Sequence, residues 1–355
     1  MAAITQNKPG RFELWRNRTA NIRTAILYLL PAFIVMGIIT FYPLVFEVWM
    51  STTDYNVKNL RADAPTANVA DQSEACQTNL KGTCTGGIFE NYRQIFTGDL
   101  PVAIANFSFI NILAFNLIWT FTNVPFHVII GVLIAVLLNV KGLWLKKFYR
   151  AIYILPIVIP SLVIAVVWRN MYDPDYGAIN LFLAGIGKIF GISPEVFKIR
   201  WIDQVDYPIA GIPLSLSYFA LLITNIWLGW PFMTIVATGA LQSIPGDLYE
   251  AASIDGASPR QSFLSITVPL LRPAMIPAAV YGIVSTFNLF NLIYLLSGGG
   301  PLRQTEILVT TAYRLVNENR LYGVAAAFSV IIFFVLLGLT LITNRFTKAT
   351  ERYDA

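Results

Sequence analysis

The chain has 355 residues, of which 56% are hydrophobic and only 13% are charged, and its mean hydropathy is +0.61. Soluble domains carry about 25% charged residues, so this composition excludes an ordinary soluble protein. The formal net charge of +5 does not point to nucleic acid, because no basic stripe with interleaved aromatic residues lies outside the segments that flank apolar windows.

Six apolar windows lack Asp, Glu, Lys and Arg, and each reaches the roughly 17–25 residues that a helix needs to cross a bilayer. Barrel strands of about 10 residues do not fit windows of this length. The sequence therefore predicts an all-α, polytopic membrane protein with six transmembrane helices. The expected spans are 24–50, 110–139, 150–171, 214–240, 269–296 and 320–344.

The charges between the spans predict the orientation of the chain. With the N-terminus inside, the inner segments carry 14 basic and six acidic residues, whereas the outer segments carry 10 basic and 13 acidic residues. This distribution follows the positive-inside rule, so both termini are expected to be cytoplasmic. The predicted parts are an inner tail at 1–23, a first span at 24–50, an outer loop with an insertion at 51–109, a core of five spans at 110–344 with an inner loop at 241–268, and an inner tail at 345–355.

Prolines inside the apolar windows predict distortions of the helices. Pro156 and Pro160 predict a kink in the third span, and Pro125 and Pro231 predict interruptions of the second and fourth spans. In the outer loop, Cys76 and Cys84 either close a small ring in an oxidising compartment or remain free thiols.

Polar residues recur at helical spacing inside the spans. In the second span, Asn116, Asn123 and His127 fall on one stripe of a helix. Such residues either hydrogen-bond neighbouring helices or line a wet substrate path. No Asp or Glu lies in a span core to exchange protons with His127, so we expect this histidine to bond another helix. The candidates for a substrate path are Asn116, Asn123, Tyr218, Asn225, Trp230, Asn288, Asn291 and Tyr294.

The sequence carries no recognisable catalytic or metal-binding motif. The segment nearest to a phosphate loop, GIGKIFG at 185–191, lies in an outer loop and lacks the Ser or Thr that follows the lysine. No His, Cys or Asp cluster has metal-ligand spacing, and no nucleophile elbow is present. The chain is therefore predicted to be a conduit rather than an enzyme.

The inner loop between spans four and five predicts two short helices. Pro245 suits the first turn of one helix, and Gly256 suits the left-handed residue that ends it. Ser258 and Gln261 have the spacing of a capping box, with Pro259 at the first position of the second helix. Small alanines on the first helix would let another protein approach closely, which favours a docking element over a solvated linker.

This loop carries a family resemblance. EAA at 250–252, then Gly256, then I-x-V-P at 266–269, resembles the cytoplasmic motif of binding-protein-dependent ABC importer permeases. The segments ENYRQIF, GAIN, GGGPLRQTEIL and YGVAAAFSV are similar to the carbohydrate branch of that family. The closest type is the first permease subunit of maltose, glycerol-phosphate and oligosaccharide systems.

The resemblance implies a permease of the cytoplasmic (inner) membrane that imports a sugar by alternating access. It implies a second homologous permease, an ATP-binding subunit dimer that holds ATP and Mg, and an extracytoplasmic solute-binding protein as partners, with lipid around the chain and no cofactor in it. The alternatives are an ion-coupled secondary sugar transporter and an ABC permease for a non-sugar solute. The residues expected to couple to the ATPase are Tyr249, Glu250, Ala251, Ala252, Asp255, Gly256 and Ala257.

Overall fold

The computed structural model describes residues 11–53, 55, 89–100, 104, 106–140, 142–208 and 213–347, and the side chains of 11–22, 25, 346 and 347 are not described. Within these ranges every regular element is a helix, which confirms the predicted all-α class. Cys76 and Cys84 lie outside the described residues. The elements are α1 (Arg11–Met36), η1 (Gly37–Phe41), α2 (Tyr42–Met50), α3 (Glu90–Thr97), α4 (Phe109–Leu138), α5 (Lys146–Val158), α6 (Ser161–Met171), α7 (Ala178–Ile189), η4 (Pro194–Phe197), α8 (Leu216–Ser243), α9 (Asp247–Ile254), α10 (Pro259–Ser262), η5 (Phe263–Thr267), α11 (Val268–Phe287), α12 (Phe290–Leu296), α13 (Leu308–Asn317) and α14 (Tyr322–Thr347).

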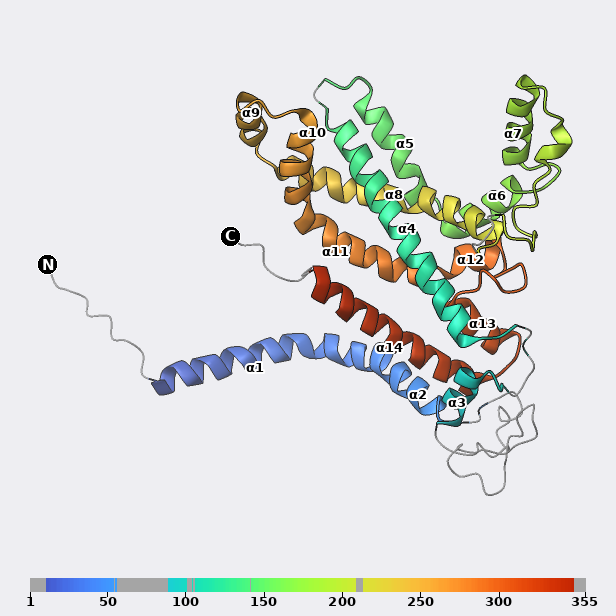
Figure 1. Ribbon diagram of the computed structural model, residues 1–355. Helices are drawn as coiled ribbons and strands as arrows, with labels where there is room; N and C mark the ends of the chain where they lie inside the picture. Colours follow the sequence, from blue (N-terminus) through green and yellow to red (C-terminus); the bar gives the residue numbers. More distant parts are fainter. Residues whose placement is uncertain are drawn as a thin grey trace.

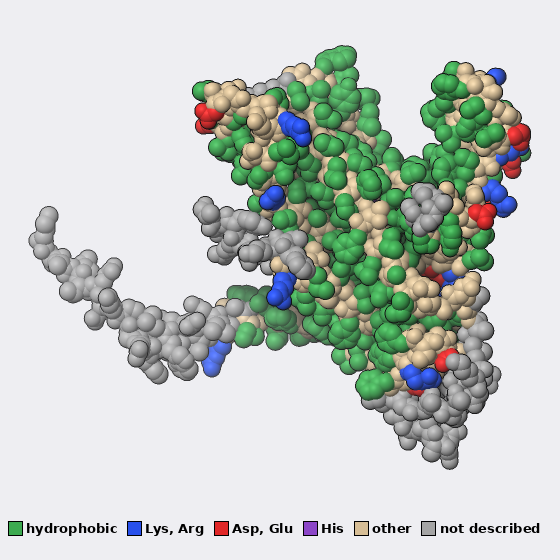
Figure 2. Space-filling view, in the orientation of Figure 1, with side chains coloured by type: hydrophobic (Ala, Val, Ile, Leu, Met, Phe, Trp, Pro, Cys, Tyr) green, Lys and Arg blue, Asp and Glu red, His purple; other side chains and the backbone are tan. Residues whose placement is uncertain are grey.

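The long helices run between two ends of the molecule (Figure 1). One end carries α9 and α10, the turn between α4 and α5, the start of α1 and the end of α14; the other carries α3, α6, α7, α12 and α13. Hydrophobic side chains cover the flanks of the long helices in Figure 2, and the charged side chains lie mostly toward the ends. The described ends of the chain thus share one side with the α9–α10 loop, as the predicted topology requires; that this side is cytoplasmic stays a prediction.

In the described part of the chain, five helical stretches are long and apolar enough to cross a membrane: 26–50, 109–138, 216–243, 259–296 and 322–345. Their positions follow the apolar windows, except that the stretch containing the predicted fifth span begins at Pro259, because α10 and η5 continue into α11. Pro125 and Pro231 lie inside the uninterrupted helices α4 and α8, so the expected interruptions are absent there.

The third span differs from the single helix predicted over 150–171. It consists of α5 and α6, which meet at a bend of 96°. Pro160 disfavours helical geometry at the residue before it, and Ile159 is accordingly extended, with φ −76° and ψ 129°. Pro156 stays within α5, so only one of the two prolines breaks the helix.

The first span is attached to the rest of the chain near its outer end. In the window 26–50 none of the side chains is buried. Asn91 of α3 donates hydrogen bonds to the carbonyl oxygens of Ser51 and Thr53, each at 2.8 Å. The backbone N–H of Gly323, at the start of α14, donates to the carbonyl of Tyr55 at 2.8 Å. Asn91 of the ENYRQIF segment and the start of α14 therefore both bond the residues that directly follow the first span.

The fifth span is broken between α11 and α12, and side chains of α4 bond the broken end. The indole Nε1 of Trp119 donates to the carbonyl of Thr286 at 3.1 Å, and the amide of Asn116 donates to the carbonyl of Phe287 at 3.2 Å. The side-chain oxygen Oδ1 of Asn116 accepts a hydrogen bond from the backbone N–H of Leu308 at 2.9 Å. At membrane depth a broken helix requires such partners, since no water is at hand to replace them.

Replacing Asn116 by Leu should lower the free energy of unfolding by about 2–4 kcal/mol, because it leaves a buried carbonyl and a buried N–H without partners. Thermal unfolding of the detergent-purified chain measures this loss. The matched control is Asn317→Ala, which removes a single hydrogen bond of an exposed side chain to its own helix. Equal melting temperatures for the two variants would contradict the bridging role of Asn116.

Candidate functional site

The α9–α10 elbow is shaped by its own caps. Gly256 has φ +79°, which favours glycine, and its N–H bonds the Ser253 carbonyl at 3.1 Å while the Ala257 N–H bonds the Ala252 carbonyl at 2.9 Å. This pair of bonds is a Schellman motif, which ends α9. The capping box predicted at Ser258 is present, and it starts α10 immediately afterwards.

A hydrogen bond braces the elbow against the fifth span. The hydroxyl of Tyr249 on α9 lies 2.9 Å from the hydroxyl of Thr267, which is buried at the end of η5. Tyr249 is half-buried and faces its own chain, whereas the sequence analysis treated it as contact area for a partner. This hydrogen bond ties the elbow to the segment that leads into α11.

The exposed surface of the elbow carries charged and small residues and two large apolar side chains. Glu250, Ala251, Asp255 and Gly256 are exposed, and the predicted coupling residues Ala252 and Ala257 are half-buried. Ile254 is 86% exposed, and Leu248 is 44% exposed. The sequence analysis did not single out Ile254. Its position directly before the Asp-Gly pair that ends the helix could have indicated an exposed apolar side chain.

Two members of the predicted polar stripe of α4, Asn123 and His127, contact α8. The amide of Asn225 donates to the Asn123 side-chain oxygen at 2.8 Å, and Asn123 itself donates to the Trp119 carbonyl at 2.7 Å. His127 lies 3.0 Å from the Asn225 carbonyl, so its Nε2 carries the proton, because a carbonyl only accepts. The histidine thus bonds another helix, in agreement with the sequence analysis.

The two helices approach closely at glycines. A Cβ at Gly229 of α8 would collide with the imidazole ring of His127, and a Cβ at Gly131 of α4 would collide with Met233. Only glycine permits this spacing. Close approach at these glycines is what brings Asn123, Asn225 and His127 within bonding distance.

A cavity of about 150 Å³ opens beside this contact, between α4, α8 and α11. Its wall includes Asn225 and His127, together with Phe232, Tyr281 and Ser285. The rings of Phe232 and Tyr281 have centroids 5.3 Å apart. Aromatic faces beside amide and hydroxyl groups can stack on a solute and hydrogen-bond it. The sequence analysis missed Tyr281 and Ser285, although Tyr281 stands out in a small-residue stretch of its span.

Three of the remaining path candidates have packing roles. Asn116 bridges helices as described above. Tyr218 is 2% exposed and packs edge-on against Phe115 and Trp119. Trp230 packs against Tyr153 of α5, with ring centroids 6.1 Å apart. Their assignment to a substrate path stays a prediction. The contacts of Asn116 and Tyr218 favour the alternative role, which is to hold neighbouring helices together.

The last three candidates lie near the break and on α12, away from the α4–α8 contact. Asn288 donates to the Val284 carbonyl at 3.3 Å, and Asn291 is exposed and donates to the Ser161 hydroxyl at 3.1 Å. Tyr294 stacks on Phe290 with centroids 5.0 Å apart, and Tyr313 of α13 lies 4.9 Å from it. These residues form a second, half-exposed aromatic group toward the outer end.

The loop that follows α12 is held by a buried carboxylate. The side chain of Glu306 is fully buried and pairs with Arg303 and with Arg314, the latter at 3.2 Å. Arg314 also donates to the carbonyl of Gly298 and lies over the Tyr294 ring, 6.0 Å from its centroid. Burial raises the pKa of Glu306, and the two guanidinium groups oppose that rise. The GGGPLRQTEIL segment thus positions the outer aromatic group.

Among the described residues no three His, Cys, Asp or Glu side chains are grouped so that they could hold a metal ion. The two regions that the structure offers are an exposed, capped elbow at one end and an aromatic and amide-lined cavity within the bundle.

Comparison with known proteins places these features in a family. Residues 127–352 match the family described as binding-protein-dependent transport system inner membrane component. The chain is 31% identical over 325 residues to the galactooligosaccharides transport system permease protein GanP of Bacillus subtilis (strain 168), across 90% of this chain and 69% of that protein. It is 36% identical over 226 residues to the trehalose/maltose transport system permease protein MalF of Thermococcus litoralis, across 63% and 70%.

A solved structure has the same fold. A chain of a bacterial ABC transporter involved in the import of the acidic polysaccharide alginate aligns with a TM-score of 0.69 and 21% identity, across 96% of this chain and 99% of that one. A second structure shows that bacterial alginate transporter in complex with an alginate pentasaccharide-bound periplasmic protein, with a TM-score of 0.68.

Replacing Gly229 by Ala should lower the free energy of unfolding by about 1–3 kcal/mol, because the new methyl group overpacks the contact with the hydrogen-bonded ring of His127. The matched control is Gly239→Ala on the same helix, where no atom lies within 4 Å of the new Cβ. That control should be neutral or stabilising, by up to about 1 kcal/mol. Thermal unfolding in detergent compares the two variants, and equal destabilisation of both would contradict the close α4–α8 contact.

Proposed function

The chain belongs to the family of binding-protein-dependent transport system inner membrane components, and on this premise we propose that it is the translocation subunit of an ATP-driven sugar or oligosaccharide importer. The observation that carries the proposal is the rigid, exposed α9–α10 elbow in a chain whose relatives include sugar-transport permeases. The family is one of inner membrane proteins, and the apolar helices of this chain agree with that location.

The elbow is the proposed contact for a separate ATPase. The sequence has no phosphate loop, so ATP and Mg would be bound by a dimer of ATP-binding subunits. Glu250, Ala251, Asp255 and Gly256 offer a small, polar surface, and Ile254 offers an apolar side chain for a pocket on the partner. Tyr249, Ala252 and Ala257 support that surface from within the elbow.

The sugar would pass through the bundle by alternating access. A second homologous permease would form the other half of the passage, and an extracytoplasmic solute-binding protein would deliver the solute at the α12–α13 end. The alginate transporter that shares this fold has been observed with such a periplasmic protein, which supports a solute-binding partner here.

The chemistry of the cavity fits a neutral, hydroxyl-rich solute. Phe232 and Tyr281 supply ring faces, and Asn225 and Ser285 supply hydrogen-bonding groups. The outer group of Phe290, Tyr294 and Tyr313 repeats the same combination, beside the exposed amide of Asn291. Sugars are held by aromatic stacking and hydrogen bonds, and neither group of residues requires a charge on the solute.

The two alternatives are an ion-coupled sugar transporter and an ABC permease for a non-sugar solute. An ion-coupled transporter requires intramembrane carboxylates or a site of unwound carbonyls. At the α11–α12 break the carbonyls of Thr286 and Phe287 accept hydrogen bonds from Trp119 and Asn116, which disfavours an ion site there. The names of the relatives favour a sugar over other solutes.

Uptake measurements separate the energy sources. In cells that carry the complete transport system, uptake of its sugar should continue when the membrane ion gradients are collapsed by ionophores, and it should stop when ATP is depleted. Both treatments are applied to the same cells, with labelled maltose and galactooligosaccharides as probes. Uptake that stops with the ion gradients while ATP remains high would refute an ATP-driven importer.

Replacing Ile254 by Asp should uncouple the chain from its ATPase, because a charge would then occupy the apolar contact at the tip of α9. We expect at least a tenfold loss of sugar-stimulated ATP hydrolysis, which corresponds to about 1.4 kcal/mol of contact energy. The matched control is Ile189→Asp on α7, which is 81% exposed but lies at the opposite end of the molecule. Co-purification of the ATP-binding subunit is measured with hydrolysis; if both variants retain it equally, α9 is not the docking surface.

A further inference from the structure

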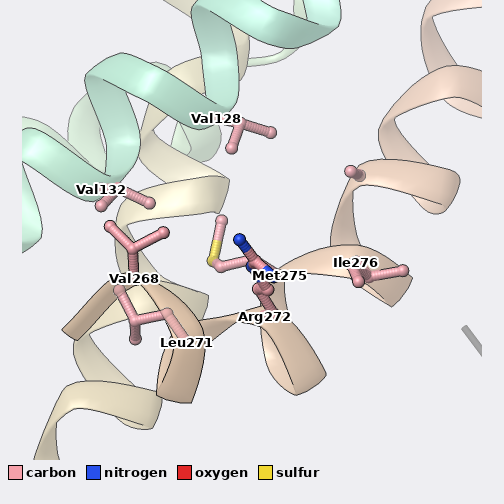
Figure 3. A pocket seen from close by; sticks show the side chains of 8 residues that line it. Val128, Val132, Val268, Leu271, Arg272, Met275 and Ile276 are labelled. Atoms are coloured by element: carbon pink, nitrogen blue, oxygen red, sulfur yellow. The ribbon is translucent and has the colours of Figure 1, made fainter. Parts of the chain in front are cut away.

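A second concavity lies on the molecule, apart from the cavity that contains His127. It has a volume of about 240 Å³ and runs between α4 and α11. Its wall is apolar, with Val128 and Val132 on one side and Leu271, Met275 and Ala279 on the other. Figure 3 shows these side chains around the opening, with the Arg272 side chain extending from α11 into the space toward α4.

Arg272 is the last charged residue of α11. The rest of that helix, residues 273–287, carries no charge and rises about 23 Å, most of the thickness of the hydrocarbon core. We therefore place Arg272 at the level of the headgroups, at the end of α11 that continues into the α9–α10 elbow. The groove continues from this level into the hydrocarbon region.

Arg272 has no acidic partner in the described part of the chain. It is exposed, and none of the described carboxylates lies within ion-pairing distance of it. An arginine at the headgroup level binds phosphate oxygens well, because its planar guanidinium donates two parallel hydrogen bonds. The complementary group is thus an anion that carries an apolar tail.

We propose that the α4–α11 groove binds one anionic phospholipid of the inner leaflet, with an acyl chain along Val128, Val132 and Met275 and its phosphate on Arg272. Moving an acyl chain from the bilayer into an apolar groove changes its free energy little. The preference for an anionic lipid therefore comes from the contact between the phosphate and the guanidinium of Arg272. The groove lies on α11, which continues through η5 into the elbow. A lipid at this position therefore contacts the helix that carries the proposed ATPase contact.

The chemistry of the groove favours a lipid over a helix of another subunit. The wall is apolar except for Arg272, which is exposed and pairs with none of the described carboxylates. An anionic lipid supplies both an apolar chain and the anion that this combination requires. A sugar is excluded on different grounds, because no hydrogen-bonding side chain other than Arg272 lines this wall.

The test uses the chain purified from its membrane in the complex in which it assembles, with native mass spectrometry to count bound lipids. The probes are phosphatidylglycerol and phosphatidylcholine with identical acyl chains, each titrated into the complex. The variants are Arg272→Gln, which removes the charge, and Ala279→Leu, which fills the groove and keeps the charge. Arg345→Gln is the matched control, since Arg345 is an exposed arginine at the inner end of α14 and lies outside the groove.

We expect Arg272→Gln to weaken phosphatidylglycerol binding about fivefold, the loss of one basic contact, and to abolish its preference over phosphatidylcholine. Ala279→Leu should weaken the binding of both lipids, and Arg345→Gln should leave the preference intact. An unchanged preference in Arg272→Gln would overturn the proposal. So would unchanged lipid binding accompanied by loss of a co-purifying permease subunit, because the groove would then be a protein interface.

Discussion

The amide of Asn116 is the point on which the arrangement of the core depends. It donates to the end of α11 and accepts from the start of α13, so a single side chain of α4 joins segments that lie 171 and 192 residues further along the chain. Helix ends at membrane depth need partners for their free backbone groups. Asn116 and Trp119 supply those partners, and this allows α11 to end and α12 to start in a new direction within the span.

The α4–α8 contact follows from the same helix. Gly131 and Gly229 let the two backbones approach, and the bonds among Asn123, Asn225 and His127 fix their register. Residues of α4 and α11 also line both concavities: His127 of α4 lines one of them, and Val128 and Val132 line the other. The helix α4 thus has three roles. Asn116 bonds the broken span, Asn123 bonds α8, and His127 and Val128 each line one of the two concavities.

Much of this fold follows from the sequence, because runs of apolar residues and the chemistry of caps are local. The windows without charges predict the membrane helices, and Ser258, Gln261 and Gly256 predict the elbow. A kink in the third span was predicted, but not which proline breaks the helix, since Pro125, Pro156 and Pro231 have the same local signature and leave their helices unbroken. Hydrogen bonding between helices was one of two roles predicted for Asn116, but its partners could not be identified, because they are distant in the chain. Tyr281 and Ser285 were missed for the same reason, as a cavity wall exists only once three helices meet.

The hydrogen bond between Tyr249 and Thr267 has a consequence for how the two regions are connected. It joins α9 to a nearly continuous helical stretch of α10, η5 and α11, which runs from the elbow to the break at Asn288. Tyr281 and Ser285, which line the cavity, lie in the last third of that stretch. The exposed surface of α9 and one wall of the cavity therefore belong to the same hydrogen-bonded element.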